Sequence, residues 1–498
     1  MDQTNHPKIQ LEIPTQILEI AKTLKNKGFS AYLVGGCVRD QLMNRRPKDW
    51  DITTNATPEE ITKNFPKTIY ENKFGTVTII NEQEDLPLDL KNVEVTPYRQ
   101  ETDYSDQRHP DQIKFCEKLE DDLARRDFTI NALAYEPFEQ ELVDLYGGLK
   151  DIKDKTVRAV GDPNERFQED ALRLMRAVRF ASELGFTLNI ETQKAVFNNS
   201  ELIKNTSKER IHDELTKIIM SPRPMDGISL MSTCGLLRFI IPELERGIRM
   251  EQGGEHIYDV WTHTLLSLQH AADKNWPFHV RLAALFHDLG KTKTRRPGVK
   301  GGKTWTFYGH EVVGERMVKE VMQRLRFPVK QTETVLKLVR NHMFFADPDK
   351  ITLSAVRRVV NKVGPEMIWD LMNLRICDRV GMGRPKEEPY RLRKYQSMIE
   401  EALRAPTSVS MLKINGNRIM AVSQETPGPK IGMILNALME EVLENPNLNS
   451  VEYLEKRTTE LKELSEGDLQ KLAQKGKEKK EEIEEKELKK IRGKYHVK

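Results

Sequence analysis

The stretch from Ala31 to Thr54 constrains the fold most, because it joins an apolar run, a glycine turn and two close aspartates. Ala31–Val34 is a short apolar run that is typical of a buried strand. Gly35 and Gly36 then indicate a tight turn, and the residues after them predict a helix. Bare backbone N–H groups in such a turn bind anions, and the positive end of the helix adds to the attraction. We therefore expect a phosphate-binding turn here.

Asp49 and Asp51 follow this helix in an extended segment. Alternation along a strand places both carboxylates on one face and Trp50 on the other. Neighbouring carboxylates repel each other, so the arrangement favours a bound cation, and Mg²⁺ that bridges them to nucleotide phosphates fits best. Taken singly, a glycine pair is most often only a turn and Asp-x-Asp only a solvated loop. Together, and in this order, they predict a phosphate site beside a metal site.

Two further groups of polar residues follow in the same part of the chain. Glu94 lies inside the β-rich run 92–96, where it is either an edge-facing residue or a third carboxylate beside the aspartates; we favour the second interpretation slightly. Arg125, Arg126 and Asp127 lie between buried positions. An arginine offers a fixed fork of donors that suits triphosphate oxygens, but it could equally pair with Asp127 as a structural lock.

From Arg166 onward the sequence becomes helical, over the stretch RFQEDALRLMRAVRFASELGF. Its expected buried face carries Ala171, Leu174, Met175, Val178 and Ala181. Its opposite side carries Arg173, Arg176 and Arg179, with Asp170 at the margin. Such a basic face is commonly just solvated, but few carboxylates of the helix balance these arginines, which favours an acidic ligand.

Asp170 and Arg173 lie one helical turn apart, where side chains are neighbours. A carboxylate accepts hydrogen bonds and a guanidinium donates them. Side by side, they complement an amino group next to a ring acceptor, the pattern that cytosine and adenine present. We therefore predict that this pair selects C and A without a template strand.

A second chemical centre is predicted in the middle of the chain. A His-Asp pair interrupts an apolar run that ends at Gly290, and a charge there is costly unless it is paired or bound to metal. Further histidines and an aspartate occur near the ends of other helical segments. Imidazole nitrogens and carboxylate oxygens are the ligands of transition-metal sites. The candidate ligands are His263, His287, Asp288, His310, His342 and Asp378.

Length and composition indicate a multidomain, charge-rich protein. The chain has 498 residues, of which 38% are hydrophobic and 31% charged, and its formal net charge is +3. This charge is too small to indicate a nucleic-acid partner by itself. Four cysteines lie far apart, and the N-terminal residues lack the profile of a signal peptide. No run approaches membrane-spanning length, so we expect a cytoplasmic protein with no membrane partner.

These motifs resemble those of a known family: the bacterial class II tRNA nucleotidyltransferases, which include the CCA-adding enzymes and their poly(A) polymerase relatives, in the form that carries an HD domain. The resemblance spans roughly residues 13–464. LVGGCVRD and KDWDITT look like the first family motif, ARRDFTINALAY like the second, and RFQEDALRLMRAVRF like the base-selecting helix. LFHDLGK, with Asp378, is similar to the HD phosphohydrolase signature.

The resemblance implies an α+β fold, in which a polymerase-β-like nucleotidyltransferase head precedes an all-α neck, an HD domain and a helical C-terminal module. We expect the head at 13–160, the neck at 161–250, the HD domain at 255–388, the C-terminal module at 389–465 and a charged tail at 466–498.

The resemblance also implies roles for individual residues. Asp49 and Asp51 would hold Mg²⁺, with Glu94 as the weakest assignment, and the HD residues would hold a divalent transition metal. Arg126 would meet the triphosphate or the sugar. The implied nucleotide-binding residues are Gly35, Gly36, Arg39, Arg126, Asp170, Arg173, Arg176 and Arg179.

The expected function is template-independent addition of CMP and AMP to the 3′ end of tRNA, with tRNA, CTP and ATP as partners and no protein partner inferred. One alternative is a poly(A) polymerase or an A-adding enzyme, because such relatives share every motif. A second alternative is that the HD domain is the main enzyme, as a phosphohydrolase. A silent RNA-binding protein is disfavoured, since it would have no need for the repulsive pair Asp49 and Asp51.

Overall fold

The computed structural model describes two compact units of the chain. The described residues are 7–71, 75–83, 85–102, 112–253, 256–298, 305–344, 351–384, 386–404, 412–444, 448–465, 467–469 and 472. The first unit comprises residues 1–339 with 381–383, and the second comprises 340–380 with 384–498. Among the described helices, none combines the length and the apolar character that a membrane crossing requires.

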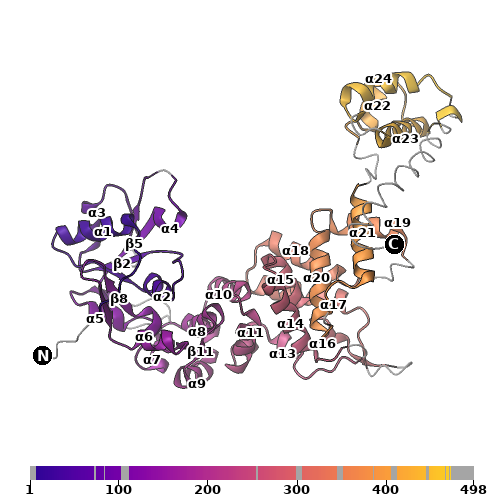
Figure 1. The fold of residues 1–498 in the computed structure, drawn as a ribbon. Helices are drawn as coiled ribbons and strands as arrows, with labels where there is room; N and C mark the ends of the chain where they lie inside the picture. The colour runs from indigo at the N-terminus through magenta and orange to yellow at the C-terminus, as the bar shows by residue number, and fades with distance from the viewer. Residues whose placement is uncertain are drawn as a thin grey trace. The chain divides into compact units, whose positions relative to one another are not determined.

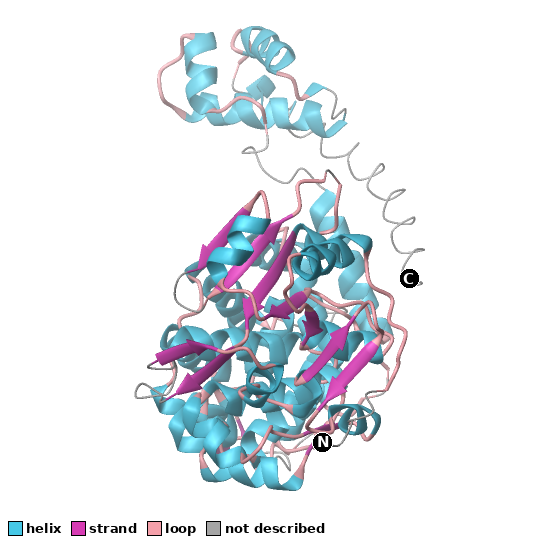
Figure 2. Cartoon of the chain, turned by 90° about the vertical axis from the view of Figure 1, so that its left-hand side faces the viewer, coloured by secondary structure: helices cyan, strands magenta, loops and turns pink. Residues whose placement is uncertain are grey.

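A mixed seven-stranded sheet organises the start of the first unit (Figures 1 and 2). Its spatial order is β3-β4-β5-β2-β1-β8-β9, and β2 and β5 are its parallel neighbours, whereas the other adjacent pairs are antiparallel. The strands are β1 (Tyr32–Val34), β2 (Asp51–Thr54), β3 (Thr68–Glu71), β4 (Thr76–Ile80), β5 (Asn92–Pro97), β8 (Leu133–Glu136) and β9 (Glu141–Asp144).

Short helices pack on this sheet and share its core. They are α1 (Thr15–Asn26), α2 (Gly36–Leu42), α3 (Pro58–Asn64), α4 (Leu88–Lys91), α5 (Leu119–Ala124) and α6 (Gly148–Lys153). Trp50 and Ile52 lie in the same apolar cluster as Ile17 and Leu24 of α1. α3 begins with a capping box, in which Thr57 and Glu60 satisfy two backbone N–H groups.

Three smaller elements complete this region: the ribbon β6 (Arg99–Thr102) with β7 (Gln112–Phe115), the 3-10 helix η1 (Thr129–Asn131) and β10 (Thr156–Val157). The sequence of residues 102–114 is polar and predicts a loop, and its residues 103–111, between these two ribbon strands, lie outside the described residues. The α+β class expected from the sequence is confirmed, with helices that follow the sheet along the chain.

The chain becomes helical after the sheet, and α8 packs against α10 and α11. The elements are α7 (Pro163–Glu169), α8 (Leu172–Leu184), β11 (Thr187–Leu188), α9 (Ile190–Asn198), η2 (Ser200–Asn205), α10 (Lys208–Met220), α11 (Pro224–Thr233), α12 (Leu237–Ile240) and α13 (Pro242–Glu245). The stretch that begins at Arg166, projected as a single helix from its sequence, forms two helices in the structure. The backbone of Asp170 is extended, and its carboxylate accepts a hydrogen bond from Leu172 N, which starts a new helix.

Among the described residues, five helices and one ribbon complete the first unit, whose boundary lies near residue 340. They are α14 (Val260–Asp273), α15 (Phe278–Phe286), α16 (Lys291–Thr294), β12 (Arg296–Pro297) with β13 (Trp305–Thr306), α17 (His310–Arg324) and α18 (Val329–Asn341). α14 packs along α15, so the ends of these helices bring the predicted histidines together.

The second unit is helical where it is described. Its helices are α19 (Leu353–Val363), α20 (Ile368–Gly381), α21 (Tyr390–Arg404), α22 (Gly416–Ser423), α23 (Pro429–Glu444) and α24 (Val451–Leu461). The last three share an apolar core of their own, built around Ile419, Ile434, Leu438 and Leu454. Most of the charged tail predicted at 466–498 lies outside the described residues.

Candidate active site

The glycine turn after β1 faces the other candidate residues directly. Gly35 has a φ of +82°, a conformation that side-chain-bearing residues rarely adopt. A Cβ added at Gly35 would lie 3.0 Å from Nη1 of Arg126, and one at Gly36 would lie 3.9 Å from Oδ1 of Asp49. The turn therefore exposes bare backbone between a guanidinium and a carboxylate, as a phosphate-binding turn requires.

The carboxylates gather on one face at the start of β2. Asp51 opens this strand, and the buried Trp50 points into the core on the opposite side, as alternation predicts. Glu94 on β5 lies directly opposite Asp51 in the parallel register. Burial, followed by repulsion from Asp49 and Glu94, raises the pKa of the Asp51 carboxyl to about 7 despite the nearby Arg126. Three acids that repel one another in this way suit a divalent cation that oxygen ligands hold.

This raised pKa makes a prediction about stability. Because the pKa of Asp51 lies near 7 in the folded state, against an ordinary value of 3.8, the folded state binds more protons between these values. The free energy of unfolding therefore falls as the pH rises from about 4 to 7. The amide of Asp51→Asn does not ionise, so this variant does not lose stability in this way. In EDTA at pH 8 its free energy of unfolding should exceed that of the wild type by roughly 2–4 kcal/mol. Urea denaturation across this range should show the difference shrinking toward pH 4; a difference that grows on acidification would contradict the assignment.

The arginines of the second motif do not pair with Asp127, which was the structural alternative in the sequence analysis. Arg125 and Arg126 pair with the buried Asp122, at 2.6 and 3.2 Å, and not with Asp127. Asp127 instead pairs with Arg176 at 2.6 Å and accepts a hydrogen bond from Asn131. Burial opposes its ionisation, but these partners lower the pKa of the Asp127 carboxyl to about 2.

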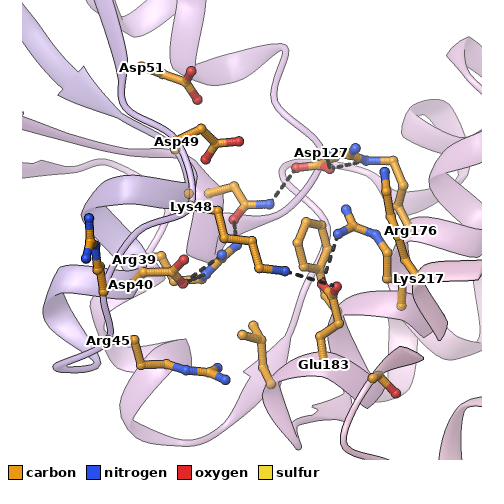
Figure 3. A pocket seen from close by; sticks show the side chains of 18 of the residues that line it. Arg39, Asp40, Arg45, Lys48, Asp49, Asp51, Asp127, Arg176, Glu183 and Lys217 are labelled. Carbon is orange, nitrogen blue, oxygen red and sulfur yellow. Dashed lines mark hydrogen bonds and ion pairs between the residues drawn. The ribbon is translucent and has the colours of Figure 1, made fainter. Parts of the chain in front are cut away.

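A cavity of about 670 Å³ joins these elements (Figure 3). Of the predicted residues, it is lined by Gly35, Gly36, Arg39, Asp49, Asp51, Arg126, Arg176 and Arg179. Arg39 is fixed in its wall, because it pairs with Asp40 at 2.7 Å and donates to Asn131 at 2.6 Å. Glu94, Asp170 and Arg173 do not belong to this lining.

The expectation that the α8 arginines lack balancing carboxylates is wrong. Each of them forms an ion pair of 2.6 Å, and Arg173 and Arg179 are buried. The partners are Glu169 for Arg173, Asp127 for Arg176, and Glu214 for Arg179, which also pairs with Glu183 at 2.9 Å. Two of these acids come from segments distant in sequence, which a projection of one helix does not include.

Asp170 and Arg173 are occupied by other partners in the structure. Asp170 forms a two-bond ion pair with Arg210 of α10, at 2.8 and 3.1 Å. Arg173 donates to the carbonyls of Arg125 and Arg166 in addition to its ion pair. Their predicted role in base selection stays a prediction, and it requires Asp170 to exchange Arg210 for a base.

The sequence analysis did not place several residues in this site that line the cavity: Arg45, Lys48, Asp127, Asn131, Phe180, Glu183 and Lys217. One signal was present, since the basic run RRPK directly precedes Asp49. Phe180 gave no such signal, because its ring acts here as a surface on which the Arg179 guanidinium stacks at 4.1 Å.

A second cluster of potential ligands lies at the ends of α14, α15 and α17. Nε2 of His263 lies 3.0 Å from Nε2 of His287 and 3.0 Å from Oδ2 of Asp288. Nε2 of His310 lies 3.3 Å from Oδ1 of the same aspartate. The Nδ1 atoms of His287 and His310 face the carbonyls of Ala284 and Phe307, so their Nε2 atoms are turned toward the cluster.

The charges in this cluster favour an ionised aspartate. Burial opposes ionisation, but His287 and Lys291 hold the pKa of the Asp288 carboxyl well below its usual value, and Nζ of Lys291 lies 2.6 Å away. Three imidazoles and a carboxylate that converge in a buried site fit a divalent metal. His342 and Asp378 are buried residues of the second unit, where Asp378 pairs with Arg375. That they complete this site stays a prediction.

Three family models match the chain in the order of these regions. They are the Poly A polymerase head domain over residues 31–158, the probable RNA and SrmB-binding site of polymerase A over 185–248, and the HD domain over 255–380. The fold and the site thus define a class of proteins that join a poly(A) polymerase head to an RNA-binding segment and an HD domain, two domain types that generally use divalent metals.

Comparison with individual proteins narrows this class. The CCA-adding enzyme of Lactobacillus helveticus (strain DPC 4571) is 47% identical over 206 residues, 41% of this chain and 50% of that protein. That of Geobacillus thermodenitrificans (strain NG80-2) is 38% identical over 293 residues, 58% of this chain and 66% of that protein. The crystal structure of the Bacillus stearothermophilus CCA-adding enzyme in complex with CTP is 26% identical, covers 90% of this chain and 98% of that chain, and has a TM-score of 0.62.

The matched part of the chain spans about half to two thirds of the length of these two curated relatives. This chain belongs to the family of bacterial CCA-adding enzymes and their poly(A) polymerase relatives that carry an HD domain. The resemblance that the sequence motifs indicated is confirmed.

Proposed function

We propose that this protein adds CMP and then AMP to the 3′ end of tRNA, and so builds or repairs the CCA end without a template. One observation carries the proposal: the acids Asp49 and Asp51 line the same cavity as the glycine turn and Arg126. A triphosphate fits this arrangement, because carboxylates for a metal lie beside donors for phosphate oxygens. The similarity to a CCA-adding enzyme solved with CTP supports the same ligand here.

The reaction that this geometry supports is in-line attack of the RNA 3′-hydroxyl on the α-phosphate. A bond forms between the 3′ oxygen and phosphorus, the bond to the β-phosphate oxygen breaks, and pyrophosphate leaves with its electron pair. Mg²⁺ held by Asp49 and Asp51, with Glu94 as a third acid, would favour loss of the hydroxyl proton and neutralise the developing charge. The Gly35–Gly36 backbone and the Arg126 guanidinium bind and orient the triphosphate, while Asp122 holds Arg126 in place.

The decisive experiment offers CTP and ATP, separately and together, to tRNA that lacks its CCA end. The proposed function predicts that CMP is added from CTP alone and that AMP follows when both nucleotides are present. Addition of AMP alone would instead identify a poly(A) polymerase or an A-adding enzyme. No addition of either nucleotide would refute the nucleotidyltransferase assignment.

A second candidate activity rests on the His263, His287, Asp288 and His310 cluster. It is phosphohydrolysis at a divalent transition metal, for which His342 and Asp378 are the further proposed ligands. Replacing both His287 and Asp288 by Ala should abolish metal binding at this site, measured by titration with Mn²⁺ or Co²⁺, together with any release of phosphate. Nucleotide addition should remain within about threefold, because these residues lie outside the nucleotide cavity. Loss of addition with retained hydrolysis would reverse the assignment of the two centres.

The remaining expectations from the sequence are part of this proposal. They comprise the domain boundaries at 13–160, 161–250, 255–388, 389–465 and 466–498, and a cytoplasmic location.

A further inference from the structure

Arg45 is an exposed cation at the nucleotide cavity that the proposed mechanism does not use. Its guanidinium forms no ion pair or hydrogen bond with a described residue. The other arginines of the cavity lining all form ion pairs: Arg39, Arg46, Arg126, Arg176 and Arg179. An unpaired guanidinium that lines a catalytic cavity is available for an anionic ligand.

The backbone holds this arginine in a defined position. α2 ends at Leu42, and Asn44 adopts a left-handed conformation with a φ of +53°. Arg45 N then donates to Asp40 O at 2.8 Å, and the next residue but one, Pro47, is buried. The short loop between α2 and β2 is therefore anchored on both sides of Arg45, so its backbone is held beside the cavity.

The position of Arg45 separates it from the phosphates of the incoming nucleotide. The phosphate turn lies at the start of α2, and Arg45 follows the end of this seven-residue helix, about 10 Å further along its axis. Figure 3 shows Arg45 and Asp51 at opposite ends of the cavity wall. A nucleotide whose triphosphate rests on the turn beside the aspartates therefore leaves this end of the cavity for a second ligand.

Other residues of the cavity lining fit a nucleic-acid strand. Lys48 comes from the same loop and Lys217 from α10, and their side chains are 88% and 51% exposed. Lys48 has a loose partner, since Glu183 lies 3.9 Å away, and such exposed pairs contribute little. Met220, also in the lining, is 43% exposed and offers an apolar surface for a base or a ribose.

We propose that Arg45 binds a phosphate of the RNA strand whose 3′ end enters the cavity, with Lys48 extending the contact. This inference rests on the proposed function and specifies where its second substrate lies. Exposed cations in sequence-independent contact with phosphates fix the register of a strand without reading its bases.

The test compares Arg45→Ala with Arg46→Ala in the full chain. Arg46 is the adjacent arginine and also lines the cavity, so its loss removes the same charge from the same place, but its guanidinium already pairs with Asp89 at 2.9 Å. Direct binding of tRNA lacking CCA is measured at several salt concentrations, with the Michaelis constant for CTP as a second readout. Arg45→Ala should weaken tRNA binding about fivefold and reduce the slope of log affinity against log salt by about one, and leave the CTP constant unchanged.

Three other results would overturn the inference. They are unchanged tRNA binding in Arg45→Ala, an equal effect of Arg46→Ala, and a raised CTP constant with normal tRNA binding, which would make Arg45 a nucleotide contact. Arg45→Lys should keep most of the tRNA affinity, because a phosphate contact depends more on the positive charge than on the bidentate geometry of the guanidinium. This variant also controls for folding. Failure of the proposed function can be told apart from failure of this inference. In the first case the wild type adds no nucleotide, whereas tRNA binding by the variants can still be measured and compared.

Discussion

Asp51→Asn is expected to reduce nucleotide addition at least about a thousandfold while tRNA binding stays intact. The substitution keeps the size of the side chain but removes the negative charge opposite Glu94 at the start of β2. Metal ions in such sites supply several kcal/mol of transition-state stabilisation, and every 1.36 kcal/mol is a factor of ten in rate. Single-turnover incorporation of CMP at saturating Mg²⁺ measures the chemical step without the influence of product release.

Asp154→Asn provides the matched control, because it removes an exposed carboxylate outside the cavity lining. It should change the rate by less than about twofold, in line with surface substitutions. Asp51→Asn should also be more stable than the wild type in EDTA at pH 8, so a loss of activity cannot be attributed to unfolding. A variant that keeps a tenth or more of the wild-type rate would exclude Asp51 as a metal ligand.

Local sequence signals predicted the centre of the fold well. The run Ala31–Val34, the glycine pair and the aspartates after it indicated a strand, a turn, a helix and a second strand, and the structure contains β1, α2 and β2 in this order. Each of these predictions depends on residues that are close in sequence. Glycine tolerance of positive φ and strand alternation are local properties, so one sequence suffices to detect them.

The pairing of charges could not be predicted in the same way. Arg176 and Arg179 find Asp127 and Glu214, which are 49 and 35 residues away in the chain, because α8 packs beside the second motif and α10. Similarly, Asp170 interrupts the predicted helix because its carboxylate caps the following turn and pairs with Arg210. Such pairs depend on tertiary packing, which neither periodicity nor local spacing contains.

Arg176→Ala is expected to lower the free energy of unfolding by roughly 2–4 kcal/mol. Asp127 is buried, and its pKa near 2 means that it stays ionised at neutral pH, so removal of Arg176 leaves a buried carboxylate without its main partner. Fully buried pairs lose about 3–5 kcal/mol in this way, and we expect less because about a third of the Arg176 side chain is exposed. Urea denaturation at pH 7 measures the change.

The double variant Asp127→Asn with Arg176→Ala separates the lost pair from the lost packing. If the stranded carboxylate causes the instability, the double variant should recover at least half of the lost free energy, since it has no buried charge to desolvate. In the wild type, the pair contributes to the free energy of unfolding only while Asp127 is ionised. Because the pKa of Asp127 is depressed from 3.8 to about 2, this contribution is fully present above pH 4 and is lost as the pH falls toward 2. Equal destabilisation of the single and double variants would show that Arg176 acts through its packing against the Phe180 ring, 5.4 Å from the guanidinium, and not through its charge.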